Sequence, residues 1–211
     1  MGGTLLYDYW RSSASYRVRI GLHFKGVPFD RVPIDLAVGA QKAPDYRERN
    51  PQGFVPMLEL EGRRIVQSLA ILGYLEELHP APPLLPPDPA DRAHVRALAL
   101  AVACDIHPLN NLRVLKHLVG PLGVAEEAKT EWIARWISEG LAALEAMAAP
   151  RAGRFLFGDA PSLADVCLVP QMYNARRFEV PLDAFPTLVC ADAEACRHPA
   201  FAAAHPDRVG P

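Results

Sequence analysis

The sequence predicts an α/β domain followed by an all-helical domain. In the N-terminal part, short apolar segments of strand length alternate with helical periodicity, whereas the later apolar patterns all have helical spacing. Between the two parts, residues 79–91 contain six prolines, which are too many for a helix or an inner strand. We therefore expect domains at residues 1–80 and 91–211, joined by a proline-rich linker at residues 81–90.

The N-terminal domain is expected to have the order βαβ followed by ββα, which is typical of a thioredoxin-like domain. The expected elements are strands at 4–9, 30–36, 55–60 and 63–66, and helices at 13–25 and from Gln67-Ser68 onward. Pro33 indicates that the second strand lies at an edge of the sheet, because proline cannot donate to a β-ladder. Residues 37–50 are expected to form a polar loop, and Glu61-Gly62 a tight turn.

Four regions of the C-terminal domain have helical patterns, and they cover residues 90–118, 126–149, a segment that starts at Ser162, and 186–201. Pro108 is expected to kink or break the first of these helices. Ser162 and Asp165 have the spacing of a capping box, in which each residue satisfies a backbone N–H of the other. The tail from His205 is expected to be disordered.

Composition argues against several classes of partner. The net charge is −2 and no basic block is present, so nucleic acid is not an expected partner. The longest apolar-rich run, residues 93–106, is too short to span a bilayer, and the N-terminus lacks the pattern of a secretory signal. The four cysteines are scattered, which argues against a disulfide framework, a zinc site or a dithiol redox centre. We expect a reduced, cytoplasmic protein without a bound metal.

Three positions in the N-terminal domain are candidates for binding an anionic ligand. Ser12 and Ser13 stand at one predicted helix start, and Gln67-Ser68 stands at another, where unpaired N–H groups and the helix dipole favour negative charge. The alternative is that Ser12 and Ser68 only cap their helices. Val55-Pro56, at the start of the third strand, either forms an ordinary trans turn or has a cis bond and exposes the Val55 backbone to a ligand.

Residues 12–22 read Ser-Ser-Ala-Ser-Tyr-Arg-Val-Arg-Ile-Gly-Leu. This stretch resembles the Ser-Ser-Cys-Ser-x-Arg-Val-Arg-Ile-Ala-Leu signature of zeta-class glutathione transferases, the family of maleylacetoacetate and maleylpyruvate isomerases. Ala14 stands where the signature has cysteine. Residues 105–115 and 171–178 are similar to two further stretches of this family, so the resemblance covers nearly the whole chain and implies the glutathione transferase fold.

The resemblance implies that glutathione is the cofactor. It assigns Gln67 and Ser68 to the γ-glutamyl carboxylate, Gln41 to the glycyl end, and the Val55-Pro56 backbone, with a cis bond, to the peptide. Ser12 is the expected hydrogen-bond donor to the glutathione sulfur, with Ser13 as its rival. A hydroxyl donor at a helix start would stabilise the thiolate, which is the form that attacks.

The substrate implied by the resemblance is a small dicarboxylate. Its expected ligands are Arg11, beside the thiolate, together with four residues of the helical domain: His107, Asn111, Arg113 and Arg177. If helix resumes after Pro108, Asn110 and Arg113 lie on one face. The alternative for each arginine alone is a solvated position on a helix, and for His107 a packed or capping role.

The implied activity is glutathione-dependent cis–trans isomerisation of a maleyl keto acid, either maleylacetoacetate or maleylpyruvate. Such substrates arise in the catabolism of tyrosine and of other aromatic acids, and the sequence does not choose between them. One alternative is a transferase that conjugates or dehalogenates small electrophiles such as α-halo acids. Another is a non-catalytic binding or scaffold protein, which Ala14 makes conceivable. The family also implies a homodimer.

Overall fold

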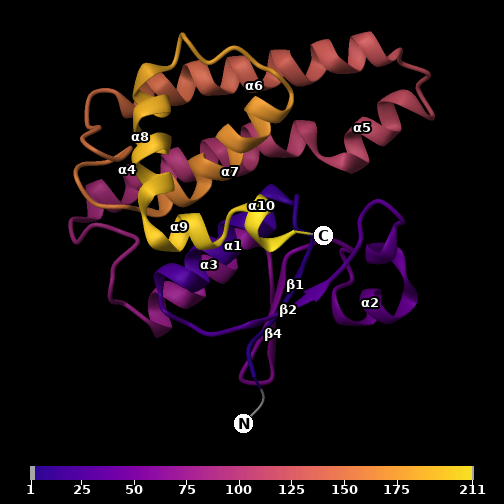
Figure 1. Ribbon diagram of the computed structural model, residues 1–211, viewed down its shortest axis with the longest axis horizontal. Helices are drawn as coiled ribbons and strands as arrows, with labels where there is room; N and C mark the ends of the chain where they lie inside the picture. Colours follow the sequence, from indigo (N-terminus) through magenta and orange to yellow (C-terminus); the bar gives the residue numbers. More distant parts are fainter. Residues whose placement is uncertain (1–2, 211) are drawn as a thin grey trace. The chain divides into compact units, whose positions relative to one another are not determined.

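The computed structural model describes residues 3–210, which divide into two compact units (Figure 1). The first unit contains the chain up to Pro83 together with the segment from His198 onward, and the second contains Leu84–Arg197. The division after Pro83 falls within the proline-rich segment. The return of the C-terminal segment to the first unit differs from the expected helical domain at residues 91–211.

The first unit is built on a four-stranded sheet with the strand order β2-β1-β3-β4. The strands are β1 (Leu5–Asp8), β2 (Asp30–Pro33), β3 (Met57–Leu60) and β4 (Arg63–Val66). Strands β1 and β2 are parallel and the other pairs are antiparallel. Strand β2 is at an edge, as Pro33 predicts, and the β3–β4 turn has positive φ at both Glu61 (52°) and Gly62 (76°), as a type I′ hairpin requires.

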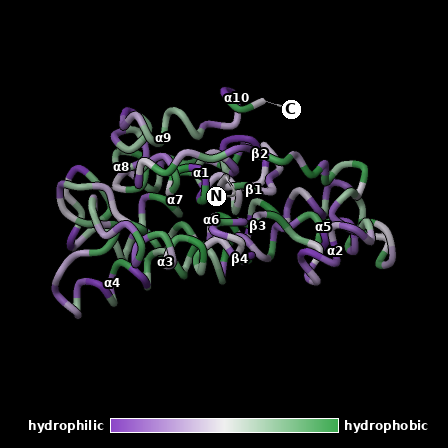
Figure 2. The backbone as a smooth tube through the Cα atoms, turned by 90° about the horizontal axis from the view of Figure 1, so that it is seen from below, coloured by the Kyte–Doolittle hydropathy of each residue, from purple (hydrophilic) through white to green (hydrophobic). Residues whose placement is uncertain are grey.

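Helices α1 (Ser13–Phe24) and α3 (Ser68–Leu78) bury apolar side chains against the sheet. Their shared core consists of Leu6, Val18, Leu22, Val27, Leu58, Leu60, Ile71 and Leu75. The two helices approach closely at Gly21, where an added Cβ would lie 2.2 Å from Cδ2 of Leu72. The backbone of α3 is largely green in Figure 2, in agreement with its apolar sequence.

Residues 37–50 are not wholly a loop, so that prediction was wrong. They contain the 3-10 helix η1 (Ala40–Lys42) and the α-helix α2 (Pro44–Arg49). Helix α2 has Pro44 at its first turn, where a missing N–H costs nothing. Its one buried side chain, Tyr46, donates a hydrogen bond to the Phe54 carbonyl (2.6 Å). A helix this short with one buried residue has no detectable apolar period.

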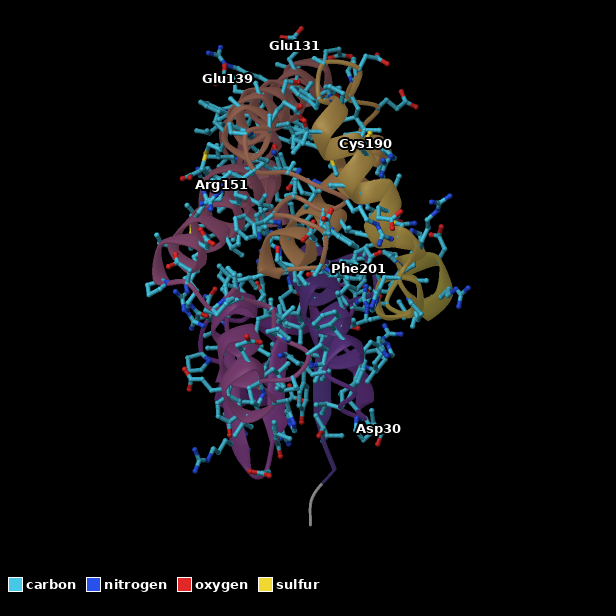
Figure 3. All side chains as sticks on the ribbon, turned by 90° about the vertical axis from the view of Figure 1, so that its left-hand side faces the viewer. Asp30, Glu131, Glu139, Arg151, Cys190 and Phe201 are labelled. Carbon is cyan, nitrogen blue, oxygen red and sulfur yellow. The ribbon has the colours of Figure 1, made fainter. Side chains whose placement is uncertain are left out.

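The C-terminal segment is also ordered, which corrects the expected disorder from His205. Helix α9 (Pro199–Ala203) lies beside α1 in the first unit (Figure 1), and the Val209 carbonyl of α10 (Pro206–Val209) accepts a hydrogen bond from Arg31 of β2 (2.7 Å). Phe201, labelled in Figure 3, is fully buried. His198 and His205 cap the two helices by accepting hydrogen bonds from Ala200 N and Asp207 N.

The second unit is helical. Its elements are α4 (Pro89–Leu100), the π-helix η2 (Ala101–Ile106), the 3-10 helix η3 (His107–Asn110), α5 (Leu112–Val119), α6 (Glu126–Ala148), α7 (Leu163–Arg177) and α8 (Pro186–Arg197). The break at Pro108 confirms the prediction made for that residue. No helix in the described part of the chain is long and apolar enough to cross a membrane.

The predicted capping box is present at the start of α7. Asp165 is fully buried and accepts hydrogen bonds from Ser162 N (2.8 Å), Ser162 Oγ (2.8 Å) and Leu156 N (2.9 Å). Burial raises the pKa of the Asp165 carboxyl to about 6, and these hydrogen bonds oppose the rise.

Candidate functional site

Ser12 is the N-cap of α1 and directly follows the loop that leaves β1. Its Oγ accepts a hydrogen bond from Ser15 N (3.2 Å). A hydroxyl has one donor and two acceptor positions, so capping leaves the Ser12 O–H group to donate elsewhere. The first turn of α1 contains no acidic residue, so the helix itself places no carboxylate at its positive dipole end. The capping role and a role in binding a thiolate are therefore compatible.

The second helix start differs from a simple serine cap. Gln67 occupies the N-cap position of α3 with φ of 72°, and its side chain does not cap the helix. Ser68 is the first helical residue, so the alternative in which Ser68 is the N-cap was wrong. Ser68 is buried, and its Oγ accepts a hydrogen bond from Arg17 Nη1 (3.4 Å).

Arg17 connects the two helix starts. Its side chain comes from α1, one turn after Ser13 on the same face, and reaches Ser68 at the start of α3. Arg17 is only 2% exposed, so its charge acts in a region of low dielectric. Both helix N-termini and a buried guanidinium therefore favour negative charge in this part of the first unit.

The Val55-Pro56 bond is cis, as expected. Among residues 3–210, neither the N–H nor the carbonyl of Val55 has a backbone hydrogen-bond partner. The preceding loop is held by Asn50, whose Nδ2 donates to the Phe54 carbonyl (2.8 Å) and whose Oδ1 accepts from Gln52 N (3.1 Å). The Val55 backbone is therefore available to pair with an extended ligand.

Two further glutamines lie against this same loop. Gln67 Nε2 donates a hydrogen bond to Gln52 Oε1 (2.9 Å). Gly53, with φ of 62°, approaches Gln41 so closely that an added Cβ would lie 2.9 Å from the Gln41 carbonyl oxygen. The buried Gln41 Oε1 has no hydrogen-bond partner within the described part of the chain.

The structure therefore brings Gln41, Val55-Pro56, Gln67 and Ser68 together around one loop. Ser68 and Arg17 offer hydrogen-bond donors to an anionic group, and Val55 offers a backbone N–H and carbonyl that have no backbone partner among residues 3–210. These groups fit a small acidic peptide. Arg17 and Gln52 are not among the residues that the sequence predicted for this site, although the spacing of Arg17 from Ser13 could have indicated the former.

In the second unit, the sequence-predicted residues lie around the break at Pro108. His107 begins η3, and Asn111 is the N-cap of α5, with its Oδ1 accepting from Arg113 N (3.2 Å). Asn110 ends η3 and its Nδ2 donates to the Ile106 carbonyl (3.5 Å). Asn110 and Arg113 thus do not share a helix face, because the extended Asn111 separates their helices.

The remaining arginines have different surroundings. Arg177 is the last residue of α7, and its guanidinium lies 4.5 Å from the centre of the Phe178 ring. Its neighbour Arg176 forms an ion pair with the buried Asp192 (2.6 Å). Arg11, in the first unit, is exposed, with its guanidinium 4.3 Å from the centre of the Trp10 ring. No group of His, Cys, Asp or Glu suited to a metal occurs among residues 3–210.

Models of known protein families match parts of both units of the chain. Residues 3–77 match the model of the glutathione S-transferase N-terminal domain, and residues 126–203 match that of the C-terminal domain. A maleylacetoacetate isomerase of Rhizobium meliloti (strain 1021) is 52% identical, over 99% of this chain and 98% of its own.

Two solved structures are similar over nearly their full lengths. One is the maleylacetoacetate isomerase of Methylobacterium extorquens AM1 with bound malonate and glutathione, which has a TM-score of 0.94 and 41% identity, with 98% of each chain covered. The holo structure of a maleylpyruvate isomerase, a bacterial zeta-class glutathione S-transferase, has a TM-score of 0.95 and 44% identity, with 97% of each chain covered.

Proposed function

Because this chain belongs to the glutathione S-transferase family, among its zeta-class maleylacetoacetate and maleylpyruvate isomerases, we propose that it is a glutathione-dependent cis–trans isomerase of a maleyl keto acid. The observation that carries the proposal is the convergence of Ser68, Gln67, Gln41 and the unpaired Val55 backbone around one loop. This arrangement suits a small acidic peptide, and glutathione is such a peptide.

Each part of glutathione has a suitable set of partners. The γ-glutamyl carboxylate is assigned to Gln67 and Ser68 at the start of α3, where Arg17 adds a buried positive charge. The cysteinyl backbone is assigned to Val55, which pairs with it as a neighbouring strand would. The glycyl end is assigned to the loop that contains Gln41.

Glutathione held by these residues would supply the nucleophile, a thiolate suited to reversible addition to the cis double bond of the substrate. The chain's part is to hold the thiol in its ionised form, since a free thiol has a pKa of about 8.5. Ser12, through its O–H group and its place at the start of α1, is the assigned donor to the sulfur, with Ser13 as the alternative. Ala14 is compatible with this chemistry, because the nucleophile belongs to the cofactor.

A maleyl keto acid has two carboxylates, which need matched cations when they leave water. We assign this role to Arg11, Arg113 and Arg177, because the planar guanidinium binds a carboxylate through two parallel hydrogen bonds. His107 and Asn111 are assigned as further polar ligands. The bound malonate in the Methylobacterium extorquens relative, a small dicarboxylate, supports this substrate class.

The test is turnover of maleylacetone with glutathione present at far below the substrate concentration. An isomerase converts all the substrate and leaves the glutathione concentration unchanged. A conjugating or dehalogenating transferase stops when glutathione is consumed, and it acts on α-halo acids in preference. A binding or scaffold protein gives no turnover with either substrate. Turnover that stops when glutathione is consumed, or no turnover at all, would contradict the proposal.

We also infer a homodimer in the cytoplasm. Leu100, at the end of α4, is 44% exposed, and an exposed leucine on a helix suits a contact between subunits. Cys104, Cys167, Cys190 and Cys196 are all free thiols, and Cys190 is visible on the surface of α8 in Figure 3, as is compatible with a reducing compartment. Sedimentation equilibrium of the wild type and Leu100→Glu tests the dimer.

A further inference from the structure

Asp8 and Arg19 form a fully buried ion pair in the first unit. Both side chains are 0% exposed, and Arg19 Nη1 lies 2.8 Å and 3.0 Å from the two carboxylate oxygens of Asp8. Asp8 ends β1, while Arg19 lies in the middle of α1. The pair therefore links the strand and the helix that lie on either side of the short loop containing Ser12.

Arg19 makes two more hydrogen bonds. Its Nη2 donates to the Trp10 carbonyl (3.0 Å), inside that loop, and its Nε donates to the Ala204 carbonyl (3.0 Å) at the end of α9. A single guanidinium therefore contacts the strand end, the loop and the C-terminal segment. Its rigid planar shape fixes the relative directions of these three contacts.

Arg31 of β2 makes a parallel connection to the same carboxylate. Its Nε donates to Asp8 Oδ2 (2.7 Å), and its Nη1 donates to the Val209 carbonyl (2.7 Å) at the end of α10. The His205 ring meets the Tyr16 ring edge-on, with centroids 6.0 Å apart. The segment His198–Gly210 thus touches α1 and β2 at several points, and we call it the C-terminal clasp.

The Ala204 and Val209 carbonyls of the clasp accept hydrogen bonds from the two arginines that pair with Asp8. A buried charge is costly unless its hydrogen-bonding positions are filled. Without the clasp, Arg19 Nε and Arg31 Nη1 lose their acceptors, and water enters beside Asp8. The Arg19 guanidinium then has no fixed position from which to hold the Trp10 carbonyl.

We propose that the C-terminal clasp positions the loop of residues 10–13, and that Arg19 is the positioning residue through which it acts. As far as catalysis is concerned, the proposal rests on the proposed function, in which Ser12 or Ser13 of this loop stabilises the glutathione thiolate. A displacement of about 1 Å in such a donor is enough to weaken catalysis strongly.

The first test needs no ligand. Amide hydrogen exchange is measured over residues 9–15 in the wild type, in Arg19→Met and in a chain that ends after Arg197, which lacks the whole clasp. We expect exchange to accelerate about tenfold or more in both variants, as loss of a hydrogen bond to a charged group predicts. The control is Arg63→Met, an exposed arginine of β4, which should leave this exchange unchanged. Unchanged exchange in a folded Arg19→Met variant would overturn the proposal, even if the shortened chain fails to fold.

The second test follows the pKa of the glutathione thiol bound to the enzyme, by the ultraviolet absorbance of the thiolate. We expect this pKa to rise by about one unit in Arg19→Met, a tenfold change in ionisation, with glutathione affinity little changed. A thiol pKa equal to that of the wild type would also reject the proposal. If the wild type binds no glutathione while exchange responds as expected, the proposed function fails and the positioning role stands.

Discussion

Arg17 Nη1 donates a hydrogen bond to the hydroxyl oxygen of Ser68 (3.4 Å), so that a buried guanidinium from α1 stands at the start of α3. Because the hydroxyl oxygen accepts this bond, its own hydrogen is directed to another acceptor. In our assignment that acceptor is the γ-glutamyl carboxylate. Arg17 therefore acts on the cofactor both through Ser68 and through its charge.

We predict that Arg17→Met weakens glutathione binding by about 1.5–3 kcal/mol, or roughly ten- to a hundredfold in Kd, because a charged hydrogen-bond donor is lost. Isothermal calorimetry measures this loss. Folding stability is a poor measure of it, because an apolar side chain of similar volume often replaces a buried charge without loss. If Arg17 acts through Ser68, combining Arg17→Met with Ser68→Ala gives less than the sum of the two effects. Full additivity would contradict that route.

We predict that Ser12→Ala has two separable effects. It removes the cap of α1, which costs about 1 kcal/mol of folding stability, and it raises the pKa of bound glutathione. Ser12→Asn keeps a capping oxygen without the hydroxyl, whereas Ser12→Thr keeps both. We therefore expect Asn to restore stability alone and Thr to restore the thiol pKa as well, as measured by thermal unfolding and by a pH–rate profile.

The matched control is Ser13→Ala, which leaves the Ser12 cap in place. A shifted pH–rate profile in Ser13→Ala, with a normal profile in Ser12→Ala, would transfer the donor role to Ser13. Ala14→Cys, which restores the residue of the family signature, should change the rate only modestly. An inactive wild type that gains activity from Ala14→Cys would show that the chain itself must supply a thiol.

We predict that Asp165 makes the protein less stable as pH rises. The folded-state pKa of its carboxyl, about 6, exceeds the ordinary value of 3.8, because burial disfavours the charged form. Between these two pH values the unfolded chain holds fewer protons than the folded one, so the free energy of unfolding falls as pH rises. The stabilisation is complete below about pH 4 and lost above about pH 6.

The measurement is urea unfolding on both sides of this pH window, in the wild type and in Asp165→Asn. The variant lacks the titrating group, so its stability should fall less across the window, by an amount on the order of 3 kcal/mol. Equal pH dependence in the two proteins would mean that the pKa of Asp165 is ordinary.

The sequence predicted elements with a regular pattern or a local chemical signal. The serine cap and apolar stripe of α1, the Glu61-Gly62 turn and the Ser162 capping box are all present. The cis bond at Val55-Pro56 followed from the family resemblance, since an X-Pro sequence alone favours trans.

The missed features depend on contacts between segments far apart in the chain. The tail beyond His205 is short and polar, and its Val209 carbonyl accepts a hydrogen bond from Arg31 of β2. Just before the tail, the Ala204 carbonyl accepts one from Arg19 of α1. No sequence pattern indicated a role for Gln52, because its hydrogen-bond partner Gln67 is fifteen residues away in the chain. Arg17 and Arg19 are in a helix whose sequence indicated an apolar stripe, yet both are buried and hydrogen-bonded across the unit.

The last prediction separates two neighbouring arginines of α7. In our assignment Arg177 binds a substrate carboxylate and offsets the negative charge that develops as the thiolate adds, so Arg177→Ala should lose roughly ten- to a thousandfold in kcat/KM. Glutathione affinity, measured by calorimetry, should hardly change.

Arg176 has a structural role, because it forms an ion pair with the carboxylate of Asp192, which is only 2% exposed. Arg176→Ala removes the arginine of that ion pair, so we expect it to lower folding stability by about 1–3 kcal/mol while the folded enzyme keeps nearly normal kcat/KM. Adding Asp192→Asn should recover part of that stability, because the buried negative charge that had lost its arginine is then gone. Steady-state kinetics on maleylacetone at a temperature where both variants are folded decides between them. If Arg176→Ala is the catalytically impaired variant, the assignment is displaced by one residue, and if neither variant loses activity, the substrate carboxylate is bound elsewhere.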